Sequence, residues 1–222
     1  MTHTVHPYSF RIGILRNWKS RWFGKKKYQD FLKGDVLLRE WLEKRMKGMY
    51  VDSIEMERSH DTVKVIFRTS RPGLVIGRKG DGVEKLKKDI GRFLNNLNLE
   101  AKPKVAVSVE EVRHPETKAG IVAQMVAENL EKRLPFRRVM KQTVEKVMSN
   151  KGVLGVKLSL SGRLGGAEMS RKEWLKKGKM PLQTLKADID YTSLRASLPY
   201  GDLGIKVWIY KDTNTNNKGD KK

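Results

Sequence analysis

The stretch RPGLVIGRKGDGVEKL, residues 71–86, decides the fold of the first half of this chain. Its glycines precede a segment, about residues 82–97, whose apolar residues recur with the spacing of an amphipathic helix. A dinucleotide-binding turn needs GxGxxG directly after a strand, and a phosphate loop needs GxxxxGK followed by Ser or Thr. Neither spacing occurs here, because Gly77 and Gly80 lie three apart with two cations between them. The spacing argues against a nucleotide-cofactor loop and predicts a tight turn between two helices.

Arg78 and Lys79, the two cations of this turn, favour contact with a nucleic-acid backbone. Gly77 and Gly80 have no Cβ, so the main chain can approach a sugar-phosphate closely. The helix that follows presents free N–H groups and the positive end of its dipole to the same anion. This is the arrangement of the K-homology (KH) domain, whose GxxG loop holds about four nucleotides. A loop that only caps two helices is the alternative.

The order of elements around the turn argues for the KH domain over simple capping. Residues 34–49 read as a helix with Asp35 as its N-cap. Two strands, a short helix before Gly77, the long helix and a further strand follow, the strands over residues 51–59, 61–69 and 104–112. This αββααβ order matches the type II KH topology, and we expect that domain over residues 28–112.

The second half predicts a separate α+β domain over residues 113–211. Pro115 is expected to open a helix that Pro135 ends, and a second helix is expected from about Phe136 to Ser149. Three alternating segments follow, over residues 153–160, 184–191 and 203–210. Each has one apolar side, so two helices on a three-stranded, mainly antiparallel sheet would bury all five segments. The fold class is therefore α+β, and residues 212–222 are expected to be a disordered tail.

The charge balance indicates a polyanionic partner. Lysine and arginine number 47 against 25 acids, a formal net charge of +22, which is unfavourable for a compact chain unless salt or a polyanion compensates it. There is no cysteine, which excludes disulfide scaffolds and thiolate zinc sites. No segment approaches the ~20 apolar residues of a membrane span. We expect a soluble, cytoplasmic protein that binds nucleic acid, with no membrane partner.

Residues 1–27 read as a basic arm that becomes ordered on a polyanion. They hold seven cations and no acid, with aromatic residues among the cations. A frayed tail with incidental charge is the alternative. The candidate contacts of the arm are His6, Arg11, Arg16, Lys19 and Arg21.

Two further basic clusters lie in the second half. On the helix after Pro135, Arg137, Arg138 and Lys141 share one broad face, which favours a path for phosphates over a merely solvated surface. A connection of about twenty residues then joins two strands, longer than an ordinary hairpin. Its glycines permit close approach of a backbone, and Trp174 offers a stacking surface. The RNA-binding candidates of this loop are Arg163, Gly165, Gly166, Arg171 and Lys172.

The enzymatic alternative rests on one pair of carboxylates. Asp188 and Asp190 lie at i and i+2 of a predicted strand and would suit a metal-dependent nuclease. Lys157 and Lys206 on neighbouring strands make a surface charge ladder the better interpretation. We therefore expect no enzyme, no cofactor and no bound metal.

Several motifs, in order, resemble the bacterial small-subunit ribosomal protein S-three family. They are VHP with RIGI, RPGLVIGRKG, FRRVMK, SGRLGGAEMSR, PLQTLKADIDY and YGDLGIKVWIYK, and they span about residues 5–211. The chain departs from the family pattern at Ser9, where relatives usually have glycine. The resemblance implies a KH domain and a C-terminal α+β domain, both bound to small-subunit rRNA in the head of the subunit.

The resemblance also implies partners and roles. Members of the family line the channel through which mRNA enters, beside ribosomal proteins four and five, and neighbour ribosomal proteins ten and fourteen. Gly77 to Gly80 match the KH loop of the family, and Arg137, Arg138 and Lys141 match the helix that faces incoming mRNA. Arg163 with Gly165 and Gly166 matches an rRNA contact. The protein is not expected to form a homo-oligomer. A free-standing KH regulator of transcripts is the alternative with the same biophysics.

Overall fold

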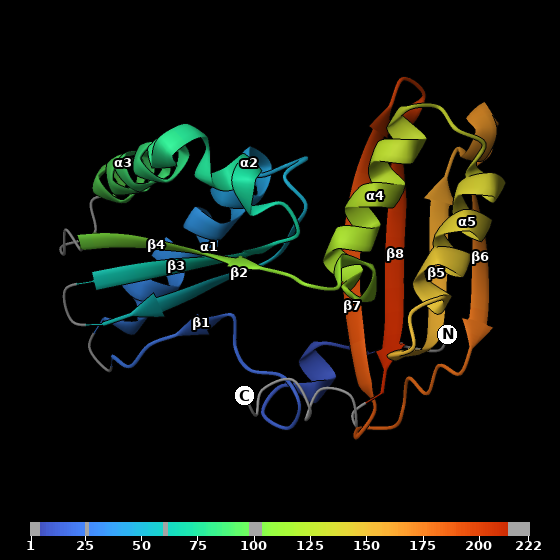
Figure 1. The fold of residues 1–222 in the computed structure, drawn as a ribbon, viewed down its shortest axis with the longest axis horizontal. Coiled ribbons are helices and arrows are strands. Elements are labelled where there is room, and N and C mark those ends of the chain that lie inside the picture. The colour runs from blue at the N-terminus through green and yellow to red at the C-terminus, as the bar shows by residue number, and fades with distance from the viewer. Residues whose placement is uncertain (1–4, 25–26, 60–61, 98–103, 213–222) are drawn as a thin grey trace. The chain divides into compact units, whose positions relative to one another are not determined.

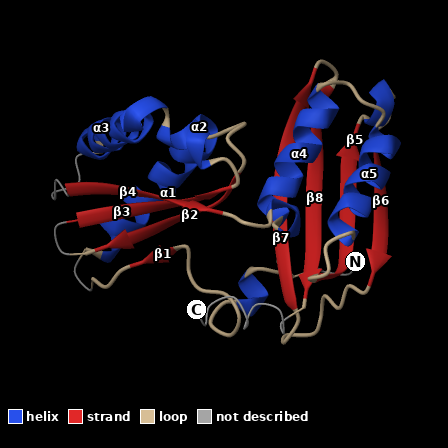
Figure 2. Ribbon diagram, viewed as in Figure 1, coloured by secondary structure: helices blue, strands red, loops and turns tan. Residues whose placement is uncertain are grey.

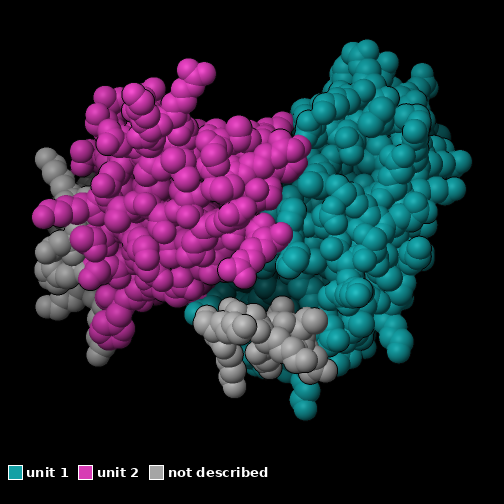
Figure 3. All heavy atoms as spheres, in the orientation of Figure 1, with its two compact units in different colours: residues 1–17, 114–222 teal, residues 18–113 magenta. Residues whose placement is uncertain are grey.

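A computed structural model describes residues 5–24, 27–59, 62–97 and 104–212. The chain divides into two compact units, shown in different colours in Figure 3. One comprises residues 18–113, and the other comprises residues 114–222 together with 1–17. The α+β fold class is confirmed in both. No helix in the described part of the chain is long and apolar enough to cross a membrane.

The unit of residues 18–113 contains the predicted αββααβ order, preceded by a two-residue strand that the sequence prediction lacks (Figure 1). Strands β2 and β3 pair antiparallel and β3 pairs parallel with β4, in the sheet order β1-β2-β3-β4. The helical crossover between β3 and β4 is what a parallel pair requires. The elements are β1 (Ser20–Arg21), α1 (Tyr28–Arg45), β2 (Val51–Arg58), β3 (Thr62–Thr69), α2 (Pro72–Ile76), α3 (Asp81–Asn96) and β4 (Lys104–Glu111).

The core of this unit lies between one face of the sheet and the three helices. Leu38 and Leu42 of α1, Phe67 of β3 and Ile90 of α3 are fully buried in it. Alternate residues of β2, β3 and β4 point to this core, as the period-2 patterning predicts.

The predicted start of α1 is wrong. The helix begins at Tyr28, and Asp35 lies inside it instead of capping it. The Asp35 carboxylate is buried and accepts hydrogen bonds from Trp22 Nε1 at 2.9 Å and from Arg58 Nε at 2.7 Å. An aspartate before an apolar run resembles an N-cap in sequence, but its partners here are supplied by residues 13 and 23 positions away.

The unit of residues 114–212 has two helices on one face of an antiparallel sheet. Figure 2 shows α4 and α5 on the same side of the strands. The strand order is β6-β5-β8-β7, and every neighbouring pair is antiparallel. The elements are α4 (Ala119–Glu131), α5 (Phe136–Met148), β5 (Val153–Gly162), β6 (Arg171–Gly178), β7 (Asp188–Leu198) and β8 (Gly201–Lys211). Their inner faces form one apolar core.

The predicted three-stranded sheet has a fourth strand. The segment expected to be a long loop contains β6, which pairs with β5 from Gly155 opposite Gly178 to Gly162 opposite Arg171. Its sequence RKEWLKKG lacks the apolar alternation of a half-buried strand, since β6 is a charged edge strand and only Leu175 packs against the core.

Two smaller boundaries also differ from the sequence prediction. Strand β7 begins at Asp188, four residues later than expected. Residues 115–117 form a separate 3-10 turn, and α4 begins at Ala119 because Lys118 is extended. The expected disordered tail lies outside the described residues except for Asp212, whose N–H donates to the carbonyl of Gly152 at 3.1 Å.

Candidate nucleic-acid interface

The GxxG loop joins α2 to α3 in the predicted tight turn. Residues Arg78–Gly80 form one 3-10 turn, with Arg78 and Lys79 exposed. Gly77 has φ 72° and ψ −175°, a region that is essentially restricted to glycine, and Gly80 is left-handed with φ 88°. The two glycines therefore allow a backbone path that presents both cations at its tip.

Gly82 is a further glycine of the loop, and sequence reasoning missed its importance. A Cβ placed there would lie 2.5 Å from the carbonyl oxygen of Val75 and 2.8 Å from that of Ile76. The first turn of α3 therefore packs directly on the carboxyl end of α2. Glycine inside a helix costs about 1 kcal/mol relative to alanine. A glycine in the first turn of the helix, two residues after Gly80, was the signal for this close approach.

Apolar side chains lie beside the loop on α2. Leu74 is 54% exposed and Ile76 is 38% exposed. Pro72 lies at the first turn of this short helix, a position that its fixed φ favours. Exposed aliphatic surface next to two cations suits a nucleotide, whose base is apolar on its faces and whose phosphate is anionic.

Helix α5 presents the second predicted cluster on its exposed side. Arg137, Arg138 and Lys141 are all exposed, while the opposite side of the helix is buried in the core. The Arg137 side chain is 71% exposed, and its guanidinium lies 3.3 Å from the carboxylate of Glu173 on β6. No ion pair within the described residues engages Arg138 or Lys141. The first turn of α5 has no acid, so two arginines lie at the positive end of the helix dipole.

The loop between β5 and β6 uses Arg163 for its own structure. The Arg163 Nε donates to the carbonyl of Ala167 at 3.0 Å, and its Nη1 donates to the carbonyl of Tyr200 at 3.3 Å. Gly165 and Gly166 have φ 70° and 82°. Arg163 therefore holds this loop against the hairpin between β7 and β8 instead of standing free for a ligand.

Arg171 and Lys172 begin strand β6 and are exposed. The Arg171 Nε lies 3.3 Å from the Glu173 carboxylate, which Arg137 of α5 also approaches at 3.3 Å. Both guanidinium groups lie 5.7 Å from the ring centroid of Phe136. Strand β6 thus brings two separately predicted clusters together at the N-terminal end of α5.

The position of Arg11 contradicts the prediction that the N-terminal segment is a free arm. Its side chain is fully buried, and its guanidinium donates to four carbonyl oxygens of its own unit. The distances are 2.6 Å to Ala187, 2.9 Å to Pro7, and 2.9 Å to both Leu182 and Thr184. Burial lowers the pKa of Arg11. This cation organises the chain before β7, and its complete burial keeps it from a phosphate.

The other predicted arm residues divide between structural and exposed positions. Arg16 Nη2 lies 2.6 Å from Asp188 Oδ1 in a largely buried ion pair. The prediction that Arg16 is a free contact of the arm is therefore also corrected. His6 packs its ring edge-on against Tyr191 with a centroid distance of 4.8 Å. Lys19 is exposed, and its carbonyl accepts a hydrogen bond from the N–H of Met56 at 2.8 Å.

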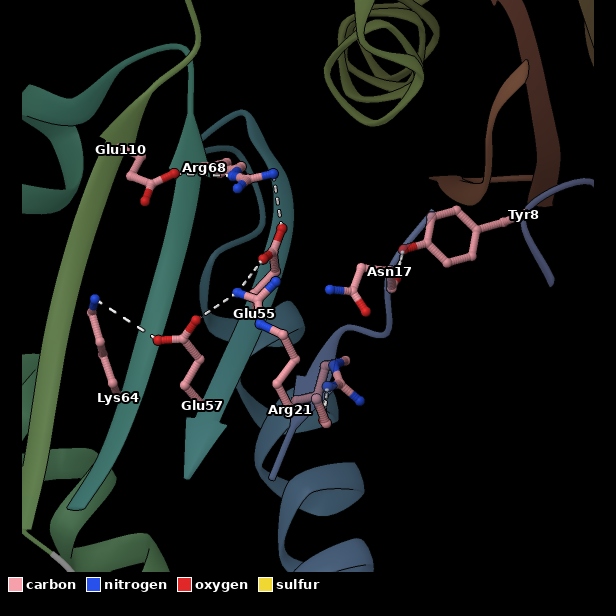
Figure 4. Close-up of polar contacts among 10 residues, drawn as sticks. Tyr8, Asn17, Arg21, Glu55, Glu57, Lys64, Arg68 and Glu110 are labelled. Carbon is pink, nitrogen blue, oxygen red and sulfur yellow. Dashed lines mark hydrogen bonds and ion pairs between the residues drawn. The ribbon is translucent and has the colours of Figure 1, made fainter. Parts of the chain in front are cut away.

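Arg21 belongs to a balanced charge network on the open face of the β1-β2-β3-β4 sheet (Figure 4). Its Nη2 lies 2.9 Å from Glu55 and 2.8 Å from Glu57. Arg68 forms two further ion pairs, with Glu55 at 2.9 Å and with Glu110 at 3.0 Å. These cations are largely neutralised by carboxylates of the same face, so this face offers a polyanion little attraction.

Asp188 and Asp190 are buried ion-pair partners, not a surface charge ladder. Asp190 lies 3.1 Å from Lys211 Nζ and accepts from the N–H of Ala119 at the start of α4 at 3.2 Å. Burial alone raises the pKa of Asp190, but the nearby Lys211 and Arg16 outweigh burial and hold this pKa well below its usual value. The nuclease alternative needs these carboxylates for a metal, and both already serve internal cations.

Comparison with known proteins covers both units. The model described as "KH domain" matches residues 37–117, and the model described as "Ribosomal protein S3, C-terminal domain" matches residues 126–209. Curated relatives called "Small ribosomal subunit protein uS3" match almost the whole chain. The relative from Syntrophomonas wolfei is 44% identical over 94% of this chain and 88% of its own length. Those from Maridesulfovibrio salexigens and Myxococcus xanthus are 44% and 42% identical, over 95% and 99% of this chain and 95% and 96% of their own lengths.

Proposed function

The chain belongs to the small ribosomal subunit protein uS3 family, and from this premise we propose that it binds small-subunit rRNA in the head of the subunit and lines the channel through which mRNA enters. Membership makes the chain a structural, non-enzymatic constituent of the small ribosomal subunit in the cytoplasm. The finer proposal rests above all on the exposed cationic side of α5.

The N-terminal half of α5 has a charge arrangement that a polyanion would stabilise. Arg137, Arg138 and Lys141 are neighbours on one helix surface and repel one another. Two of them also lie at the positive end of the helix dipole. Phosphate groups of a passing strand would relieve both costs. This is the reason to assign mRNA, which must be held without regard to sequence, to α5.

Other contacts divide between rRNA and protein neighbours. We assign rRNA to the GxxG loop with Arg78 and Lys79, and to Arg171 and Lys172 at the start of β6. The resemblance adds ribosomal proteins four, five, ten and fourteen as neighbours. The protein acts as a single copy within the particle, not as a homo-oligomer.

Sedimentation distinguishes this function from that of a free-standing KH regulator. A tagged full-length chain in a lysate should sediment with the small subunit and remain there at moderate salt. The control is the same lysate treated with ribonuclease, which should release the chain. A chain that stays in the light fractions before ribonuclease treatment contradicts the proposed function.

The α5 cluster is tested by the triple variant Arg137→Ala, Arg138→Ala and Lys141→Ala. Affinity for single-stranded RNA is measured as a function of salt concentration. The slope of log K against log salt should become shallower by up to ~0.7 per lost phosphate contact. The matched control replaces three exposed lysines outside every candidate site and should keep the slope; they are Lys33 and Lys44 of α1 and Lys47, which follows α1. An unchanged slope in the α5 variant removes this surface from the RNA path.

A further inference from the structure

The open face of the β6-β5-β8-β7 sheet carries a continuous row of aromatic rings and one lysine. Lys157 of β5 lies between two indoles, with its Nζ 5.3 Å from the Trp174 ring centroid on β6 and 5.2 Å from that of Trp208 on β8. Tyr191 of β7 lies 5.2 Å from Trp208, and His6 continues the row at 4.8 Å from Tyr191. The row crosses all four strands in their spatial order.

The row lies on the face that the helices leave uncovered. Val207 and Ile209 of β8 are buried in the core, so Trp208 between them points to the other side. Leu175 packs against the same core, which places its neighbour Trp174 on the open face. Trp174 is 59% exposed. Both indoles therefore face the side of the unit away from α4 and α5, where Trp174 is exposed and Trp208 is half-buried.

The charges on this face are strongly unbalanced. Strand alternation places five cations there against one acid, Asp202, which accepts a hydrogen bond from Ser197 at 2.6 Å. Within the described residues, no ion pair engages any of these cations. The five cations are Lys157, Lys172, Lys176, Arg195 and Lys206. This contrasts with the sheet of the other unit, where Arg21 and Arg68 are neutralised by carboxylates.

We propose that this open face is a second RNA surface, which stacks unpaired bases on Trp174 and Trp208 while the surrounding lysines contact phosphates. The inference rests on the proposed function and assigns base stacking and phosphate contact to the open face of the C-terminal sheet. Single-stranded RNA is bound by aromatic rings set among cations, because every base has a stacking face. Lys157 holds both indoles by cation–π contact and puts a positive charge at the centre of the row.

The geometry separates this surface from α5. The two helices and the sheet form two layers, so the exposed side of α5 and the open face of the sheet point in opposite directions. One short strand of RNA cannot contact both at once. The α5 surface lacks exposed indoles and suits phosphates, whereas the open face also has aromatic rings and suits unpaired bases.

The test compares two labelled oligouridylates of equal length with the full-length protein, one intact and one with abasic sites at its central positions. The wild-type protein should prefer the intact strand. Trp174→Ala should weaken binding of the intact strand about 5- to 150-fold per lost stacked base and leave the abasic strand unaffected. Trp174→Phe keeps an aromatic ring and should restore most of the preference. Circular dichroism checks that each variant remains folded.

The cations are tested by Lys172→Ala with Lys176→Ala, against the matched control Lys33→Ala with Lys44→Ala on α1. The first pair should weaken both strands and reduce the salt slope, whereas the control pair should not. The inference is overturned if Trp174→Ala leaves the ratio of the two affinities unchanged, or if both strands lose affinity equally. The sedimentation experiment is independent of this result. If the chain sediments with the small subunit but does not prefer the intact strand over the abasic one, the proposed function stands and only the stacking surface is rejected.

Discussion

Arg11 shows that a cation in a basic chain can serve the fold instead of the partner. Its guanidinium donates to four carbonyls, three of them in the segment 182–187 that precedes β7. An arginine can do this because its donors are spread in a planar fork, which a lysine lacks. The sequence places Arg11 among seven cations of residues 1–27 and does not distinguish it from the exposed ones.

The buried carboxylate of Asp190 should make the free energy of unfolding decrease at low pH. Its pKa in the folded protein lies below the ordinary value, chiefly because Lys211 and Arg16 outweigh the effect of burial. The stability that this carboxylate contributes is therefore present above its unfolded pKa and is lost as pH falls through its folded pKa. Asp190→Asn should reduce the free energy of unfolding at pH 7 by about 3 kcal/mol, because Lys211 is left buried without its charged partner.

Urea denaturation at pH 7, 5 and 3 measures this effect. The difference between wild type and Asp190→Asn should be the same at pH 7 and 5. It should begin to shrink as pH falls below about 4, near the unfolded pKa, and should continue to shrink toward the folded pKa. Asp202→Asn is the control, because that carboxylate is exposed and an amide can still accept from Ser197. A difference that stays constant down to the acid-unfolded state would show that Asp190 acts through packing and not through its charge.

At the scale of elements, the α2–loop–α3 unit was the most predictable part of the candidate site. The positions of Gly77 and Gly80, the tight turn and the long helix are local properties that short-range steric rules determine. The close packing at Gly82 was not predicted, because it depends on where the carbonyls of Val75 and Ile76 lie in space.

Gly77→Asp should weaken RNA binding by the KH loop for two reasons. The residue has a backbone conformation essentially restricted to glycine, and a Cβ there would lie 3.0 Å from the amide nitrogen of Gly82. The strain is on the order of 1–3 kcal/mol, and the new carboxylate repels phosphate. Affinity for a short single-stranded RNA should fall, while the chain should still sediment with the small subunit through its other surfaces.

Lys79→Asn separates charge from strain in this loop. Lys79 has φ 52° and ψ 17°, a left-handed conformation that asparagine tolerates. This variant should lower RNA affinity by less than Gly77→Asp and should leave thermal stability unchanged. If folded Gly77→Asp failed to enter the small subunit at all, the KH loop would dominate the binding free energy, contrary to the several surfaces inferred here.

Strand β6 marks the limit of element prediction in the second half. Its residues are mostly charged, and only Leu175 reaches the core, so no periodicity in the sequence identifies a strand. Its backbone hydrogen bonds to β5 and its edge position decide the structure. The segment that was expected to be a functional loop is this strand. It places Trp174 on one face of the sheet and Glu173 beside Arg137 on the other.

At the scale of the whole molecule, the net charge of +22 predicts that the free protein is stabilised by salt. Screening weakens the repulsion among exposed cations more than it weakens buried pairs such as Arg16 with Asp188. Raising NaCl from about 50 mM to about 500 mM should add roughly 1 kcal/mol and raise the Tm by about 2–4 °C.

The α5 triple variant is the internal comparison for this prediction. It lowers the net charge from +22 to +19, since three cations are removed, and should show a smaller rise in Tm with salt. Differential scanning calorimetry at the two salt concentrations measures the change in Tm of the wild type and of the variant. A Tm that falls with salt would mean that attractive ion pairs outweigh the repulsion.

The sequence by itself determined the α+β class, the αββααβ order, the GxxG turn and the amphipathic side of α5. Each of these depends on residues within one or two turns of one another, so spacing is sufficient to predict it. Tertiary structure decided which cations remain exposed, because three of the four carbonyls that Arg11 binds, and the carboxylate that Arg16 binds, lie more than 170 positions along the chain. It also decided the row from Trp174 to Tyr191, since strand order and register, not sequence distance, bring those rings together.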